Sequence, residues 1–132
     1  KYYFRYADDF IFLNASREYL EELEKKMCQF TTYNLNLTVH PNKIIYRKLN
    51  QGIDWLGYVL LPYHSILRTT TRKRMFKKIK RKVKIYNCGL LSAEKLNNSV
   101  QSYLGLLQHC NGYKIEQKLR NEIWLNKIST GF

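Results

Sequence analysis

The sequence is poor in cysteine, and its few cysteines are far apart. Cys28, Cys88 and Cys110 are the three cysteines among 132 residues, and no two of them form a CxxC pair. An odd number of scattered cysteines argues against both a zinc site and a disulfide framework, so we expect reduced intracellular thiols.

Long hydrophobic runs are also missing. No stretch approaches the eighteen or so consecutive apolar residues that a membrane helix requires, and there is no signal-peptide pattern. We therefore expect no membrane partner. Hydrophobic residues still make up 45% of the chain, which suffices for a packed core. The chain opens on Lys1 inside a strand-like run, and we therefore expect it to be a piece of a longer protein.

Acidic residues are scarce, and their absence is concentrated in one segment. The chain has 23 Lys and Arg against 10 Asp and Glu, a net charge of +13. Residues 64–86 contain no acid and carry ten basic residues: Arg68, Arg72, Lys73, Arg74, Lys77, Lys78, Lys80, Arg81, Lys82 and Lys84. Such a block is typical of a protein that binds a polyanion, most often nucleic acid. The alternative is a solvated basic face without a partner.

Two of the few acids are adjacent, in the stretch KYYFRYADDFIF at residues 1–12. Asp is depleted in strands and costly to bury without a partner, so Asp8 and Asp9 are expected at the tip of a hairpin over residues 2–13. They could form an ordinary turn. However, tight hairpin turns favour glycine, and two like charges lie side by side here. A divalent cation would relieve that repulsion, since Mg²⁺ prefers carboxylate oxygens.

The first half of the chain alternates between strand and helix patterns. A helix capped by Asn14 or Ser16 is predicted by the apolar stripe Leu20, Leu23, Met27 and Phe30. Residues 35–39, 43–49 and 53–61 are predicted to be strands, the last two joined around residues 50–52. This order favours an α+β fold with one helix packed on a sheet.

After Pro62 the pattern becomes helical. A helix from Thr71 is predicted with a stripe of Phe76, Ile79, Val83 and Tyr86, and residues 87–89 end it. Ser92 is expected to cap a second helix with Leu96, Val100, Tyr103 or Leu104, and Leu107 on one side. A third helix follows Asn111-Gly112, with Ile115, Leu119 and Ile123 on one side. Residues 64–132 are therefore predicted to form a three-helix unit.

Four stretches resemble, in order, motifs of bacterial reverse transcriptases of the group II intron, retron and diversity-generating retroelement types. YADD at 6–9 resembles the YxDD signature, and LNLTVHPNK at 35–43 resembles the segment that ends in the palm lysine. IDWLGYV at 53–59 resembles the primer-grip strand pair, and SYLGLLQHCN at 102–111 resembles the thumb helix. The resemblance implies an RNA-directed DNA polymerase, with the end of its palm at residues 1–63 and its basic helical thumb at 64–132.

The resemblance also implies roles for individual residues. Asp8 would ligate Mg²⁺ directly and Asp9 less directly, in a site of two ions that needs a further aspartate outside this chain. Lys43 would lie near the triphosphate of the incoming dNTP, unless it is an ordinary turn lysine. Tyr6 and Ala7 would line the primer or nucleotide side, although Tyr6 could equally be a core residue.

The remaining implied contacts are with an RNA template and a DNA primer. Trp55, Leu56, Gly57 and Tyr58 would form the primer grip, although plain packing explains them nearly as well. Arg68, Arg72, Lys73, Lys77 and Lys80 are the first candidates for phosphate contacts along the duplex.

The chain departs from the family pattern at its start. The family's catalytic site needs an aspartate on an earlier strand and the fingers that bind dNTP, and neither precedes Lys1. We therefore expect that this chain alone does not polymerise, and that the parent enzyme is cytoplasmic and bacterial. The alternative is a non-catalytic basic module that binds nucleic acid, in which Asp8 and Asp9 are only a turn.

Overall fold

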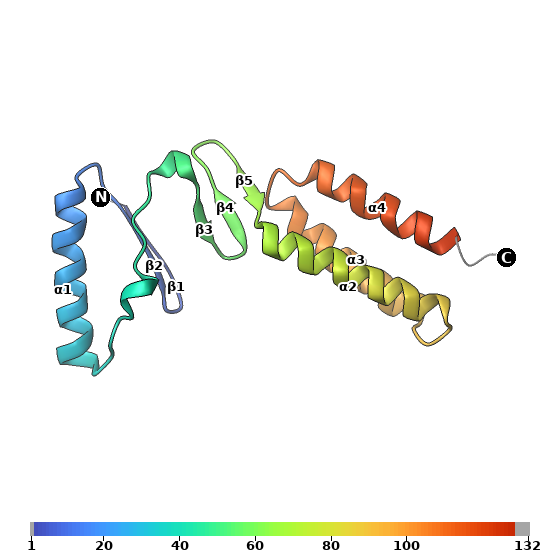
Figure 1. Ribbon diagram of the computed structural model, residues 1–132, viewed down its shortest axis with the longest axis horizontal. Helices are drawn as coiled ribbons and strands as arrows, with labels where there is room; N and C mark the ends of the chain where they lie inside the picture. The colour runs from blue at the N-terminus through green and yellow to red at the C-terminus, as the bar shows by residue number, and fades with distance from the viewer. Residues whose placement is uncertain (1, 129–132) are drawn as a thin grey trace. The chain divides into compact units, whose positions relative to one another are not determined.

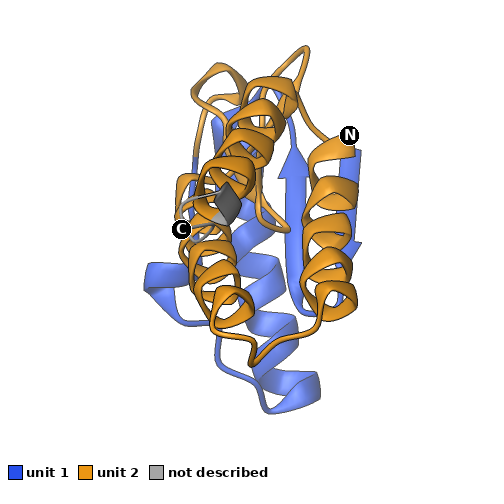
Figure 2. Cartoon of the chain, turned by 90° about the vertical axis from the view of Figure 1, so that its right-hand side faces the viewer, with its two compact units in different colours: residues 1–46 blue, residues 47–132 orange. Residues whose placement is uncertain are grey.

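The computed structural model describes residues 2–128 and divides the chain into two compact units, residues 1–46 and 47–132 (Figures 1 and 2). Within the described residues there are two small antiparallel sheets and four α-helices, so the predicted α+β class is confirmed. Every helix of this part of the chain is too short or too polar to span a membrane.

The first unit consists of a hairpin, a long helix and an irregular segment. Strand β1 (Tyr2–Tyr6) pairs with β2 (Asp9–Leu13) in the predicted hairpin. Helix α1 (Arg17–Leu35) begins at Ser16, whose hydroxyl accepts the Tyr19 N–H at 3.1 Å, as expected of a cap. Within residues 2–46 no hydrophobic side chain is fully buried.

Two predicted strands of the first half are wrong. Residues 35–39 are not a strand, because α1 continues to Leu35 and ends at Asn36, which adopts a left-handed φ of 51°. Asn tolerates that conformation and commonly ends helices. Residues 43–49 are not a strand either: the region forms two short 3-10 turns, η1 (Pro41–Lys43) and η2 (Leu49–Gln51).

The second unit begins with a three-stranded antiparallel sheet. Strand β3 (Ile53–Trp55) pairs with β4 (Tyr58–Leu60), and β4 pairs with β5 (Ser65–Leu67), a strand that the sequence pattern did not reveal. The predicted strand over 53–61 is therefore two strands and a turn. This sheet is hydrogen-bonded to the helices that follow.

Three helices complete the second unit: α2 (Thr69–Asn87), α3 (Ala93–Gln108) and α4 (Tyr113–Ile128) (Figure 1). Ser92 caps α3 as predicted, since its hydroxyl accepts the Lys95 N–H at 3.3 Å. The helices enclose the hydrophobic core of the described residues, which consists of Leu67, Met75, Ile79, Val83, Leu96, Leu104, Leu107 and Leu119.

Long-range hydrogen bonds join the sheet and the helices into one unit. The Tyr58 hydroxyl donates to the Leu106 carbonyl at 2.9 Å, and the Ser65 hydroxyl donates to the His109 carbonyl at 3.0 Å. The Asn111 N–H donates to the Ser65 carbonyl at 2.8 Å. The expected boundary between residues 63 and 64 therefore falls inside the second unit, and the division lies after Tyr46.

Candidate functional site

The turn of the first hairpin consists of Ala7 and Asp8. Tyr6 and Asp9 are the last paired residues on either side, so Asp8 lies at the tip as expected, whereas Asp9 is the first residue of β2. Ala7 has a φ of 52°, a conformation in which glycine is usual at this place of a two-residue turn. The Arg5 Nε donates to the Ala7 carbonyl at 2.9 Å and holds the turn. A strained non-glycine residue at a hairpin tip is a feature often found at functional sites.

Asp8 and Asp9 are both exposed, and neither carboxylate makes a hydrogen bond or ion pair with another residue of the described chain. Two free, adjacent carboxylates are a suitable set of oxygen donors for Mg²⁺. They are not a complete site: within residues 2–128 no three His, Cys, Asp or Glu side chains come together. Further ligands would have to come from substrate phosphates or from another segment.

The two faces of the hairpin differ in character. Tyr6 lies directly opposite Asp9, so these side chains share one face at the carboxylate end. On the other face, Tyr3 stacks with Phe12 at 5.1 Å between ring centroids, and the Arg5 guanidinium lies 5.3 Å from the centroid of Phe10. The aromatic contacts stiffen the hairpin, and Tyr6 is the exposed aromatic side chain that shares a face with Asp9.

Lys43 is placed at the end of the η1 turn. The His40 Nδ1 accepts the Asn42 N–H at 3.2 Å, and the Lys43 N–H donates to the His40 carbonyl at 2.9 Å. The side chain is exposed and makes no ion pair with Asp8 or Asp9. Its placement after Pro41 therefore fits an ordinary turn lysine as well as a phosphate contact.

A second two-residue turn joins β3 and β4. Trp55 pairs with Tyr58, and the turn residues Leu56 and Gly57 have φ angles of 49° and 88°. Positive φ at both positions is the pattern of a type I′ turn, which favours Asn-Gly. Gly57 therefore lies in the turn and not within a strand. Leucine at the first position is strained and is 46% exposed.

Leu56→Asn is expected to stabilise the second unit by about 1 kcal/mol, because asparagine tolerates the left-handed conformation better than leucine. The melting temperature, measured by circular dichroism, checks this. Gly57→Ala is the matched control and is expected to lower the melting temperature. If Leu56 at the tip contacts nucleic acid, the stabilised variant binds more weakly. An unchanged or lower melting temperature would contradict the strain at this turn.

The β3–β4 turn is fixed to the start of α2. The Gly57 carbonyl accepts the Arg68 N–H at 2.9 Å, and the Arg68 Nε lies 2.9 Å from the Asp54 carboxylate. Tyr58 is committed to the fold through its hydroxyl, and burial raises the pKa of that hydroxyl. Of the predicted primer-grip residues, Leu56 and Gly57 therefore form the tip and Tyr58 anchors it.

Helix α2 has one buried side and one charged side. Met75, Ile79 and Val83 are buried, one turn apart along the helix. Two basic side chains near the flanks of the helix have partners: Lys80 lies 2.7 Å from the Glu122 carboxylate, and Lys82 donates to the Ser99 hydroxyl. Lys80 also lowers the pKa of Glu122, chiefly through their hydrogen bond.

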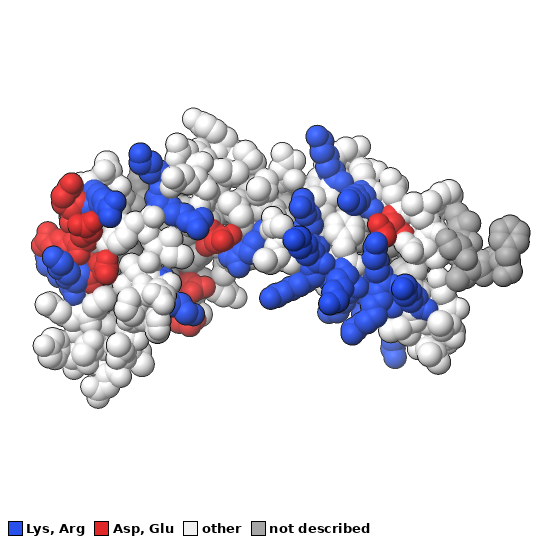
Figure 3. All heavy atoms as spheres, viewed as in Figure 1, with Lys and Arg blue, Asp and Glu red and all other residues white. Residues whose placement is uncertain are grey.

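The remaining basic residues form an exposed surface opposite the buried stripe, since successive residues of a helix turn by about 100°. We call this surface the free basic face. Its members have no acidic partner within residues 2–126 and are Lys73, Arg74, Lys77, Lys78, Arg81 and Lys84. Figure 3 shows Lys and Arg side chains gathered over α2.

The free basic face revises the predicted phosphate contacts. Lys73 and Lys77 belong to it, whereas Arg72 is exposed but lies in line with the buried stripe, in the first turn of α2. Arg68 and Lys80 are held in ion pairs instead. Four further members of the face were not among the first candidates: Arg74, Lys78, Arg81 and Lys84. A helical wheel centred on Ile79 would have found them, because they lie on the side away from Met75 and Val83.

Comparisons of this chain with protein-family models, with curated proteins and with solved structures found no match.

Proposed function

We propose that this chain is the palm-end and thumb portion of an RNA-directed DNA polymerase. In this proposal α2 holds the template–primer duplex, and Asp8 and Asp9 contribute to the catalytic metal site of the full-length enzyme. The observation that carries the proposal is the free basic face. Its six cations are exposed and have no acidic partner within residues 2–126, so they are available to bind a polyanion.

The spacing of these cations suits a nucleic-acid backbone. Lys73, Lys77 and Arg81 recur every four residues, about 6 Å apart along the helix, and Lys84 extends the surface to about 16 Å. Successive phosphates of one strand are separated by a similar distance. Contacts of this kind position a duplex without reading its sequence.

The carboxylates suit the second part of the proposal. Asp8 and Asp9 would hold Mg²⁺ together with the substrate phosphates and one further carboxylate of the parent enzyme. When bound, two such ions stabilise the attacking and leaving oxygens of a phosphoryl transfer. The chain's own contribution is a hairpin that presents Asp8 at its tip and Asp9 beside it as the first residue of β2, with the turn fixed by Arg5.

A second candidate is a non-catalytic module that binds nucleic acid through α2 alone. The incomplete donor set is compatible with it, since Asp8 and Asp9 have no third metal ligand within residues 2–128, but the first candidate also places the further carboxylate outside this chain. Both candidates require the free basic face. They differ only in whether the hairpin carboxylates bind metal.

The salt dependence of binding tests the part that both candidates share. The affinity of the 132-residue chain for a fluorescein-labelled RNA–DNA hybrid is measured by anisotropy between about 50 and 300 mM salt. If five of the six cations each neutralise one phosphate, the plot of log K against log salt has a slope of about −4 to −5. Two hybrids of scrambled sequence should bind alike. Salt-independent affinity would refute the proposal.

A further inference from the structure

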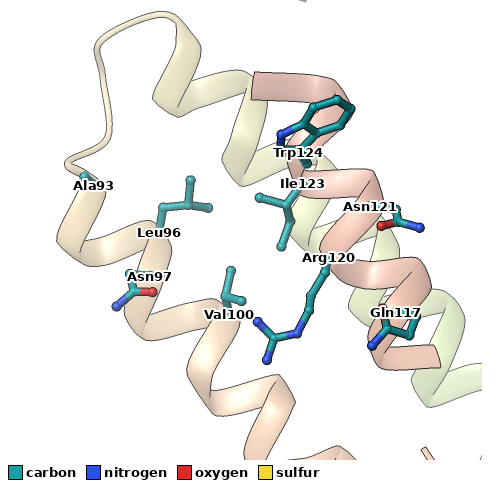
Figure 4. Close-up of a pocket in the computed structure, with 9 residues that line it drawn as sticks. All are labelled: Ala93, Leu96, Asn97, Val100, Gln117, Arg120, Asn121, Ile123 and Trp124. Atoms are coloured by element: carbon teal, nitrogen blue, oxygen red, sulfur yellow. The ribbon is translucent and has the colours of Figure 1, made fainter. Parts of the chain in front are cut away.

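Helices α3 and α4 border a groove of about 510 Å³ that plays no part in the proposed function (Figure 4). Its lining recurs at intervals of three and four residues on each helix. Helix α3 contributes Ala93, Leu96, Asn97 and Val100, and α4 contributes Gln117, Arg120, Asn121, Ile123 and Trp124. The groove therefore runs along both helices for about two turns, or about 10 Å.

The groove has an apolar floor and a polar rim. Leu96 and Val100 of α3 point toward Ile123 of α4 in Figure 4. Three side-chain amides belong to its lining, and in Figure 4 those of Asn97 and Asn121 lie on the outer sides of their helices. The Trp124 indole lies toward one end and is 64% exposed, an unusual exposure for the largest apolar side chain.

Arg120 is the only cation among these nine residues, and Glu116 neutralises it. The Glu116 Oε1 lies 2.9 Å from the Arg120 Nε and 2.8 Å from one terminal nitrogen. The pair holds the guanidinium in place, and Figure 4 shows it extending into the groove beside Val100. A neutralised site does not attract phosphate. The exposed indole of Trp124 suits a flat ligand instead, and it lies at the other end of the groove from the Arg120 guanidinium in Figure 4.

A nucleobase is a ligand of this kind: it is a flat, uncharged ring with hydrogen-bond donors and acceptors along its edge. Unpaired bases of single strands are commonly bound by stacking on aromatic rings and guanidinium planes, with hydrogen bonds to their edges. The chain's charge of +13 would bring such strands to its surface. No member of the free basic face lines the groove, so the two surfaces are separate.

We propose that the α3–α4 groove binds an unpaired nucleobase of a single-stranded RNA or DNA segment, stacked on Trp124. This inference rests on the proposed function only in that the chain meets nucleic acid. It adds a site that distinguishes unpaired from paired strands, which the free basic face does not.

Tryptophan fluorescence tests the site in the 132-residue chain. The chain has two tryptophans, so Trp55→Phe leaves Trp124 as the sole indole, and all comparisons are made within this background. Single-stranded oligoadenylate and oligouridylate of eight nucleotides are the probes, and a blunt RNA–DNA hybrid is the comparison. We expect the single strands to quench Trp124 emission by stacking and the blunt hybrid to leave it unchanged.

Affinity measurements on a matched pair of variants complete the test. Trp124→Ala is expected to weaken single-strand binding about tenfold and to leave hybrid affinity and its salt slope unchanged. Tyr113→Ala, which removes another exposed aromatic ring from α4, is expected to change neither. Circular dichroism verifies that both variants are folded.

The outcomes separate this inference from the proposed function. Unchanged Trp124 emission with every single strand, together with normal salt-dependent hybrid binding, would overturn the groove site and leave the proposed function standing. Equal losses for Trp124→Ala and Tyr113→Ala would also overturn it, because they would indicate unspecific contact. If the parent chain bound neither the single strands nor the hybrid, both proposals would be refuted.

Discussion

If the chain belongs to the polymerase that we propose, Asp8→Asn in the full-length protein is expected to reduce DNA synthesis by about a thousandfold or more while template–primer binding is retained. Asparagine keeps the size and one acceptor oxygen but removes the charge that would hold Mg²⁺, and several kcal/mol of transition-state stabilisation depend on that charge. Binding should survive because our proposal assigns it to α2, more than fifty residues further along the chain. Single-turnover primer extension and hybrid anisotropy measure the two quantities.

The matched control for this variant is Glu22→Gln, which also replaces a carboxylate by an amide in the first unit but breaks only an exposed pair with Lys26. It should extend a primer normally. Asp8→Asn should leave the stability of the metal-free protein level or slightly raised, since it relieves repulsion between adjacent carboxylates. If Asp8 is only a turn residue, the variant loses some stability and synthesis continues at the original rate.

The 132-residue chain permits an independent test of the same carboxylates. Mn²⁺ broadens nearby NMR resonances, so it should broaden the signals of Asp8 and Asp9 in the chain, and Asp8→Asn should remove the effect. The signals of Asp54, which is paired with Arg68, serve as an internal reference. Broadening at Asp54 equal to that at Asp8 would mean that the metal binds unspecifically.

Two double variants of α2 are expected to differ widely in hybrid binding although each removes two positive charges. Lys77→Ala with Arg81→Ala takes charge from the free basic face and should reduce affinity at least about tenfold, with the salt slope smaller by about 2. Lys80→Ala with Lys82→Ala removes cations that Glu122 and Ser99 already engage, and should change binding little. Equal losses would mean that only net charge matters and that the free basic face has no special role.

The Lys80→Ala and Lys82→Ala substitutions should instead lower the free energy of unfolding. Lys80 lowers the pKa of Glu122, so the pair contributes stability above the ordinary carboxyl pKa of 4.5, and that contribution is lost as pH falls through the lowered pKa. Lys80→Ala should therefore lower the free energy of unfolding at neutral pH. In acid, the variant and the parent chain should have the same free energy of unfolding. Denaturation at several pH values checks the sign.

The helical half of the chain could be predicted closely from its sequence because the responsible interactions are local. Ser92 and Ser16 cap helices where their positions indicate, and Ile79, Val83 and Leu119 are buried as their spacing predicts. Helical periodicity and caps involve residues three or four positions apart, so a short window of sequence contains the whole signal.

The strands between residues 35 and 61 were predicted less well. Alternation at 35–39 and 43–49 resembled strands, but a strand requires a pairing partner, and none of the described strands pairs with either segment. Strand β5 is three residues long, too short to show a pattern. The division into units also escaped prediction, because hydrogen bonds from Tyr58 and Ser65 to residues more than forty positions away attach the sheet to the helices.

By itself the sequence determined the excess of positive charge, its concentration in residues 64–86, and the placing of Asp8 at a hairpin tip. Only the tertiary structure decided which cations remain free. Lys80 and Lys77 are equivalent in a list of residues and both are exposed, yet α4 brings Glu122 to Lys80 and no acidic partner within residues 2–126 to Lys77. The packing of α3 beside α4 likewise created the groove, since contacts between distant segments depend on how the chain folds back on itself.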